Sequence, residues 1–264
     1  MQLEIYQIDA FASNVFSGNP ATVVILTSWI SENLMREIAA ENNQAETAFI
    51  VEVGEGVFEI RWFTPITEVD LCGHATLAAA YVSFFVKEKN YDKLVFHTQR
   101  SGDLEVKRNG DVLTLNFPSD TLEKVPITSE FTSCFNIKPL EVYKGKTDYM
   151  MVFANRPEIN ALLPDFGEIA KLKCRGVTAT AKSDDVDFVS RFFAPQSGIN
   201  EDSVTGSAHV SLVPYWSEKL GKINLTARQL SIRTGYLECT YLGDRVEISG
   251  KARLYMKGII YVGE

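Results

Sequence analysis

The sequence has few cysteines and histidines, and those it has are scattered. Its four cysteines stand at positions 72, 134, 174 and 239 without a C-x-x-C pair, and its three histidines lie far apart. This spacing excludes the usual disulfide framework of a small secreted domain and the usual pattern of a zinc site. We therefore expect reduced thiols, a cytoplasmic protein and no bound metal.

Basic residues are fewer than acidic residues. Lysine and arginine number 26 against 34 aspartates and glutamates, which gives a net charge of −8. A protein with this balance repels phosphate backbones and acidic lipid surfaces. We therefore expect neither nucleic acid nor a membrane among its partners. With 17 glycines and 9 prolines in 264 residues, collagen-like and low-complexity chains are excluded as well.

Long hydrophobic runs are missing. The most apolar stretch, residues 71–86, contains His74 and is shorter than the roughly 20 residues that a membrane helix needs. It is typical of a helix buried in a protein core. The first eleven residues contain Glu4 and Asp9 and alternate as a strand does, which is not the pattern of a signal peptide.

The chain contains an internal repeat with a period of about half its length. An R-x-F-x-P motif, a G-x-A motif and an R-x-G-x-L-E motif each occur twice, at offsets of 130 to 133 residues. They lie at residues 61–65 and 191–195, 73–75 and 206–208, and 100–105 and 233–238. Because chance matches would not keep one register, the repeat predicts two homologous halves.

We place the first domain at residues 1–118 and the second at 119–264, with residues 256–264 as a strand that could join the first domain. In each half, short strands rich in β-branched and aromatic residues surround one apolar helix, predicted at residues 73–87 and 206–220. A helix that is apolar on all sides must be enclosed. The predicted fold class is therefore α+β, with two pseudo-symmetric domains, each a mostly antiparallel sheet rolled around a central helix.

The start of each predicted central helix is a candidate ligand site. Loops at residues 68–75 and 201–208 both lead into a G-x-A sequence. A helix start offers unpaired N–H groups and the positive end of the helix dipole, so amides at Gly73 and Gly206 could bind a carboxylate. Equivalent helix starts in two halves would meet at the domain boundary, where ligand sites often form.

Helix capping is the alternative interpretation of the same residues. Asp70 or Cys72 in the first half, and Asp202 or Thr205 in the second, could satisfy the free amides. The glycines would then serve only to allow a tight turn.

Glu46 and His74 are the candidate proton-transfer groups. Glu46 stands between an amide-rich turn and an apolar strand, where loss of solvent would raise the pKa of a carboxyl towards that of a neutral-pH acid/base. His74 could donate to a bound anion. A solvated strand-end glutamate and an exposed first-turn histidine are the alternatives. Cys72 and His74 are two residues apart, a spacing that does not place side chains together on a helix, so we expect no Cys/His catalytic pair.

Taken together and in this order, these motifs resemble the phenazine-biosynthesis PhzF-like family, a branch of the diaminopimelate epimerase-like fold. The resemblance covers essentially the whole chain. The matching segments are residues 9–11, 18–21, 46–49, 61–65, 73–76, 201–202, 205–208, 229 and 233–235.

The resemblance implies a site and an activity. The family's acid/base glutamate falls on Glu46, its histidine on His74, its aspartate on Asp202 and its serine on Ser207. The two helix starts of the family bind substrate, which here corresponds to Gly73, Ala75, Thr205 and Gly206. The family also implies a homodimer without a cofactor.

The expected function is a cofactor-independent isomerase that moves a proton within a small carboxylic acid. Epimerases of this fold use a Cys-Gly at each helix start, whereas this chain has Cys72-Gly73 in one half and Thr205-Gly206 in the other. A two-thiol mechanism is therefore not available, and Glu46 remains as the base. A ligand- or protein-binding module that uses the same cleft without turnover is the alternative, and a hydrolase built on Cys72 is a third.

Overall fold

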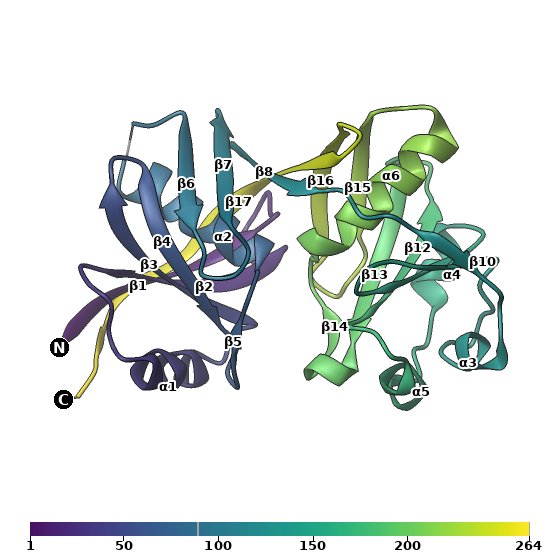
Figure 1. Cartoon of the computed structure of the whole chain (residues 1–264), viewed down its shortest axis with the longest axis horizontal. Helices are drawn as coiled ribbons and strands as arrows, with labels where there is room; N and C mark the ends of the chain where they lie inside the picture. The colour runs from purple at the N-terminus through teal and green to yellow at the C-terminus, as the bar shows by residue number, and fades with distance from the viewer. Residues whose placement is uncertain (89, 264) are drawn as a thin grey trace. The chain divides into compact units, whose positions relative to one another are not determined.

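The computed structural model describes residues 1–88 and 90–263. The chain divides into two compact units, one formed by Met1–Asn116 with the C-terminal segment from Ser249 onward, the other by Phe117–Ile248 (Figure 1). The long strand β17 (Arg245–Tyr261) runs from the second unit into the first, where it pairs antiparallel with β1. The sequence analysis allowed residues 256–264 to join the first domain, and the segment that does so begins at Ser249.

The first unit consists of short strands and two helices. Its elements in chain order are β1 (Gln2–Ala10), β2 (Asn19–Leu26), α1 (Glu32–Asn42), β3 (Glu46–Gly54), β4 (Val57–Phe63), β5 (Glu68–Val69), α2 (Gly73–Tyr81), the π-helical turn η1 (Val82–Val86), β6 (Lys93–His97), β7 (Asp103–Asn109) and β8 (Val112–Pro118).

The strands of the first unit close into a ring. Successive pairings run β1–β2–β3–β4–β6–β7–β8–β17 and back to β1. Pairs β2–β3 and β4–β6 are parallel, because a helix (α1 and α2 respectively) carries the chain across between them. The other pairs with a defined register are antiparallel, which confirms the predicted α+β class.

Helix α2 is enclosed by these strands (Figure 1). Every residue from His74 to Ala80 is buried, and several of them are alanines. Small side chains all round the helix let β1, β2 and β3 pack closely against it. The predicted helix over residues 73–87 is therefore present, although its last turn, η1, widens into π geometry.

The second unit repeats this arrangement with different lengths. Its elements are β9 (Glu123–Val125), α3 (Ser129–Thr132), β10 (Glu141–Lys144), β11 (Tyr149–Val152), α4 (Arg156–Ala161), α5 (Phe166–Lys171), β12 (Val177–Lys182), β13 (Phe188–Ala194), η2 (Pro195–Ser197), β14 (Ile199–Asp202), η3 (Gly206–Ala208), α6 (His209–Leu220), β15 (Asn224–Gln229) and β16 (Gly235–Tyr241).

The order and sense of strand pairing are the same in both units. Antiparallel β10–β11, parallel β11–β12, antiparallel β12–β13, parallel β13–β15 and antiparallel β15–β16 match β1–β2, β2–β3, β3–β4, β4–β6 and β6–β7. Helix α6 crosses between β13 and β15 as α2 does between β4 and β6. This internal correspondence has the connectivity that the sequence repeat predicted.

Helix α6 contains Pro214, which has no N–H to donate to the carbonyl of Val210 one turn earlier. The backbone N–H of Asp120 donates to that carbonyl instead, at 3.0 Å. The segment that enters the second unit therefore satisfies the helix at its proline. The predicted helix 206–220 begins as the 3₁₀ turn η3 and becomes α-helical at His209.

No helix within residues 1–88 and 90–263 is long and apolar enough to cross a membrane.

The packing around Gly235 predicts that even one added methyl group destabilises the fold. A Cβ at Gly235 would lie 2.2 Å from Cγ2 of Val204, whereas one at Gly258 would lie 3.7 Å from Ile5 Cγ2, an ordinary contact. We expect Gly235→Ala to lower the free energy of unfolding by about 2 kcal/mol through overpacking. The matched change Gly258→Ala should leave it nearly unchanged, as measured by urea unfolding. Equal stability of the two variants would contradict this packing.

Candidate active site

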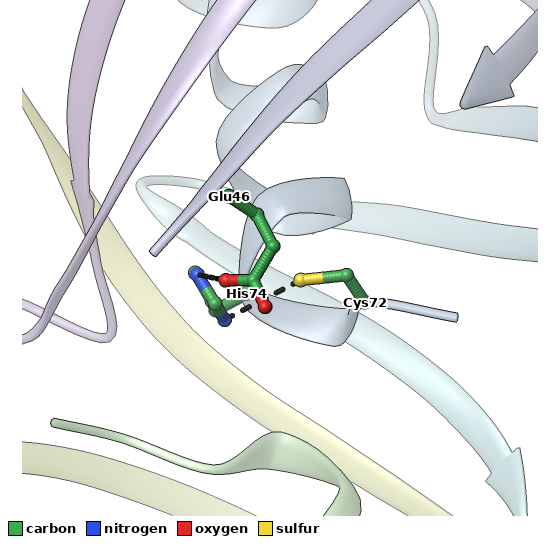
Figure 2. Close-up of side chains that lie close together, drawn as sticks. All are labelled: Glu46, Cys72 and His74. Carbon is green, nitrogen blue, oxygen red and sulfur yellow. Dashed lines mark hydrogen bonds and ion pairs between the residues drawn. The ribbon is translucent and has the colours of Figure 1, made fainter. Parts of the chain in front are cut away.

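Glu46 and His74 lie next to each other in the first unit. Glu46 is the first residue of β3 and His74 the second residue of α2, so the ring of strands places a strand end at the helix start. His74 Nε2 lies 3.1 Å from Glu46 Oε2, with side-chain exposures of 7% and 13% (Figure 2). This contact brings the two sequence-predicted residues together, and neither is the solvated side chain of the alternative interpretation.

Asn19 completes the surroundings of the His74 ring. The first residue of β2, it is 1% exposed, and its Nδ2 lies 3.3 Å from His74 Nδ1. Gly18 makes this placement possible, because it has φ +67° and a Cβ there would lie 2.1 Å from the Ala10 carbonyl oxygen. The sequence analysis assigned no role to Asn19, although the segment 18–21 was one of the motifs that carried the resemblance.

Cys72 contacts the same ring, contrary to expectation. Its Sγ lies 3.5 Å from His74 Nδ1 (Figure 2). The prediction that residues two apart do not meet was wrong here because Cys72 is the N-cap, with φ −143° and ψ 105°, and does not follow helical spacing. The three side chains thus form a chain in the order Glu46, His74, Cys72.

The pKa values of Cys72 and His74 are shifted by burial and by their acidic neighbours. Burial is the main cause that raises the pKa of the Cys72 thiol, so it is a neutral thiol near pH 7. Burial disfavours a charged His74, but the acidic neighbours Cys72 and Glu46 outweigh it and place the pKa of His74 well above its ordinary value. Because Cys72 carries no charge near pH 7, we attribute the effect there to Glu46.

The pair is at ion-pair distance without the alignment of a hydrogen bond. Within the described part of the chain, Glu46 Oε2 and His74 Nε2 are buried atoms that have no hydrogen-bond partner. Buried polar atoms are normally satisfied, so these two are available to a ligand.

Glu46, Cys72 and His74 are also the group of side chains that could hold a metal ion, with donor atoms within 4.8 Å of one another. However, Glu46 contacts Nε2 of the histidine and Cys72 contacts Nδ1. One donor atom from each of the three residues nevertheless lies within this distance of the other two.

In the second unit, Asp202 and Thr205 are held by a buried glutamine. Thr205 Oγ1 donates to Asp202 Oδ2 at 2.6 Å. Gln229 is 0% exposed, accepts from the Thr205 amide at 2.8 Å and donates to the Asp202 carbonyl at 2.8 Å and to Thr205 Oγ1 at 3.1 Å. Gln229 stood among the motif residues, but its bracing of this loop was not predicted.

Ser207 has a partner that the sequence did not reveal. Arg175 Nη1 donates to Ser207 Oγ at 2.8 Å, and the same guanidinium binds both carboxylate oxygens of Asp148. Arg175 lies in the short connection between α5 and β12, which carries no motif, so no pattern could have linked it to Ser207.

The helix starts at Gly73 and Gly206 are not capped as the alternative supposed. The N-cap residues Cys72 and Thr205 make no side-chain cap bond. Asp70 pairs with Arg100, while Asp202 accepts from Thr205 Oγ1. The amides at Gly73 and Gly206 thus remain candidates for carboxylate binding, whereas the Ala75 amide already interacts with the Cys72 sulfur. Each unit holds one group of the predicted residues.

With the fold and both groups defined, the chain can be compared with known proteins. The sequence profile of a family described as phenazine biosynthesis-like protein matches residues 8–258. The chain belongs to this family. The resemblance noted from the sequence motifs is thereby confirmed.

Relatives of this phenazine biosynthesis-like protein include bacterial and animal sequences. An uncharacterized isomerase of Pseudomonas aeruginosa is 48% identical over 262 residues, which cover 99% of this chain and 100% of that protein. A human phenazine biosynthesis-like domain-containing protein is 34% identical, with coverage of 98% and 99%. Family membership supports an isomerase function.

Solved structures agree with the fold. A PhzF-family phenazine biosynthesis protein from Enterococcus faecalis has a TM-score of 0.96 at 43% identity, covering 99% of this chain and 100% of that one. A hydroxyproline epimerase from Agrobacterium vitis, solved with bound trans-4-hydroxy-L-proline, shares the fold with a TM-score of 0.61 at 9% identity over 98% of this chain and 92% of that one.

The histidines should titrate at well-separated pH values. We expect the His74 ring to titrate above about pH 6.5, the ordinary value, because Glu46 faces it. His209 should titrate near 4, because burial lowers its pKa to about 4. Proton NMR of the ring resonances, assigned with His74→Gln and His209→Gln, checks both. Glu46→Gln should lower the pKa of His74, and an unchanged value would contradict the assigned cause.

The same shifts predict opposite effects of pH on stability. The pKa of His74 is raised in the folded state, so its contribution is complete below about pH 6.5 and is lost as pH rises through the folded value. The pKa of His209 is lowered, so its contribution is complete above about pH 6.5 and is lost as pH falls towards 4. Urea unfolding of wild type and the two glutamine variants across this range measures each contribution as a difference.

Proposed function

We propose that this protein is a cofactor-independent isomerase that moves a proton within a small carboxylic acid, with Glu46 as the acid/base. The observation that carries the proposal is the buried contact of Glu46 with His74, in which neither facing atom has a hydrogen-bond partner in the described residues. A base in such a place is shielded from water and lacks a hydrogen bond that a ligand group would supply.

The reaction needs only one proton carrier. Glu46 takes a proton from a substrate carbon, so that a C–H bond breaks and an O–H bond forms on the glutamate. The electron pair is delocalised into the substrate's own carboxyl or unsaturated system. Glu46 then returns the proton to a different carbon, so the product is an isomer and no oxidant or reductant is consumed.

The remaining residues have supporting roles. His74, whose pKa is raised, lies against Glu46 and can donate a hydrogen bond to it or to a bound anion. The amide of Gly73 is suited to a carboxylate. In the second unit, Asp202 and Ser207 are polar groups that orient and polarise the substrate, while Thr205 and Gly206 form the backbone beside them.

Thiol chemistry has less support. Burial raises the pKa of Cys72 and leaves a thiol rather than a nucleophilic thiolate near neutral pH. The corresponding position of the second unit is Thr205, which has no thiol. An epimerase with two cysteine bases is therefore not built into this chain, and Glu46 is the better base.

Glu46→Gln should separate binding from catalysis. The amide keeps the size of the side chain but cannot carry the proton, so deuterium wash-in from heavy water should fall by about 100-fold or more. A panel of amino and hydroxy acids, followed by mass spectrometry, identifies the exchanging acid with wild-type protein. Its affinity for the variant, measured by calorimetry, should survive. Cys72→Ala should cost less than about 10-fold.

Glu52→Gln, an exposed change on the same strand β3, is the matched control and should exchange like wild type. Full turnover of Glu46→Gln together with loss of activity in Cys72→Ala would shift the assignment to the thiol. If wild type binds acids tightly but exchanges none of them, the protein is a binding module and the isomerase proposal fails.

A further inference from the structure

Arg175 is a charged side chain that contacts the predicted site residue Ser207. The proposed reaction assigns no role to it. It lies between α5 and β12, where its backbone N–H donates to the Thr147 carbonyl at 2.7 Å. Its guanidinium lies over the ring of Phe192, with Cζ 5.3 Å from the ring centre. A Cβ at Gly176 would lie 2.3 Å from that ring, so only glycine lets the chain pass this closely. The arginine is thus fixed by backbone and ring contacts.

The guanidinium's hydrogen bonds are divided between two partners. Nε donates to Asp148 Oδ1 at 2.9 Å and Nη2 donates to Oδ2, which is the fork geometry of a bidentate pair. Asp148 is buried, while the arginine side chain is 40% exposed. The third nitrogen, Nη1, points at Ser207 Oγ, 2.8 Å away.

This arrangement decides how the Ser207 hydroxyl can be used. A hydroxyl has one proton to donate and two lone pairs that accept. Because Arg175 occupies a lone pair, the proton of Ser207 is left to point elsewhere. Within residues 1–88 and 90–263, no acceptor for that proton is found. A ligand oxygen would be its partner.

Charge recognition is the competing use of Arg175, and the local charges oppose it. Asp148 neutralises the guanidinium directly, and Asp202 is close enough to act on it electrostatically. A cation with two carboxylates around it does not attract a further anion strongly. The fixed directions of its N–H groups can still orient a neighbouring hydroxyl group.

We propose that Arg175 is a positioning residue, anchored by Asp148, that holds the Ser207 hydroxyl as a hydrogen-bond donor to the substrate. The role rests on the proposed function in so far as Ser207 contacts the substrate. Orientation of the hydroxyl itself is a property of the ligand-free protein and can be measured separately.

The first test uses the ligand-free protein and needs no substrate. Three-bond Hα–Hβ couplings of selectively labelled serine, with the Ser207 signal assigned by Ser207→Ala, report whether its side chain has one rotamer. We expect one rotamer in wild type and averaged couplings in Arg175→Gln. Arg156→Gln removes another arginine–aspartate bridge of the same unit, to Asp185, and should leave Ser207 unchanged. A single unchanged rotamer in Arg175→Gln would overturn the proposal.

Arg175→Lys keeps the charge and covers the case in which the glutamine variant does not fold. An ammonium lacks the planar fork and cannot hold Asp148 through two bonds and Ser207 through a third. We therefore expect averaged couplings here too. A fixed Ser207 in this variant would show that charge alone suffices, which contradicts the proposal.

The second test is a double-mutant cycle on deuterium wash-in with the exchanging acid. Arg175→Gln and Ser207→Ala should each reduce the exchange rate by about 10-fold, the scale of one hydrogen bond. In the Ser207→Ala background, loss of Arg175 should cost nothing further, because its action passes through the hydroxyl. Independent, multiplying losses would refute the positioning role. If wild type exchanges no acid, the proposed function fails while the coupling measurement still decides the role of Arg175.

Discussion

The enclosure of α2 is the constraint on which the first unit depends. A helix that is apolar on every side is stable only when strands cover all of it, and the run of alanines leaves no side chain to hold those strands at a distance. The ring from β1 to β17 meets this requirement. Because the first turn must then emerge at one end of the ring, His74 is placed where β2 and β3 begin. The contacts of His74 with Asn19 and Glu46 follow from that enclosure.

The electrostatics of this small cluster favour a carboxylate over a thiol as the reacting group. Cys72 and Glu46 contact opposite nitrogens of one imidazole, yet burial acts on them differently. Burial raises the pKa of the Cys72 thiol, which therefore remains protonated, and the neighbours of His74 raise the pKa of its ring. The contacts of Glu46, His74 and Cys72 resemble those of a cysteine triad. In our proposal, however, the reacting group is Glu46 and not Cys72.

The second unit uses the same connectivity with different supports. The buried Gln229 and Arg175 both donate hydrogen bonds to its loop from Asp202 to Ser207, and the amide of Asp120 donates to the helix carbonyl left free at Pro214. Polar supports of this kind cost little where their donors and acceptors are paired, as those of Gln229 Nε2 and Oε1 are. These hydrogen bonds hold Ser207 and Asp202 in place, whereas in the first unit the buried helix α2 places His74.

Much of this protein was readable from its sequence, because periodicity and repetition are local properties. The repeat predicted two homologous halves, and the apolar runs predicted both central helices. The short strands β9 to β11 and helices α3 to α5 were missed, since a few residues show no period. Glu46 and His74 were found as separate candidates, and only the motif resemblance joined them.

Tertiary structure decided the rest, because the remaining contacts join residues far apart in sequence or off regular geometry. The C-terminal strand joined the first unit because its partner is β1, at the other end of the chain. Cys72 reached His74 because an N-cap does not follow helical spacing. Arg175 reached Ser207 across 32 residues, and Arg175 itself lies in no motif. A sequence determines which segments must be buried; which side chains then meet is determined by how the buried segments pack.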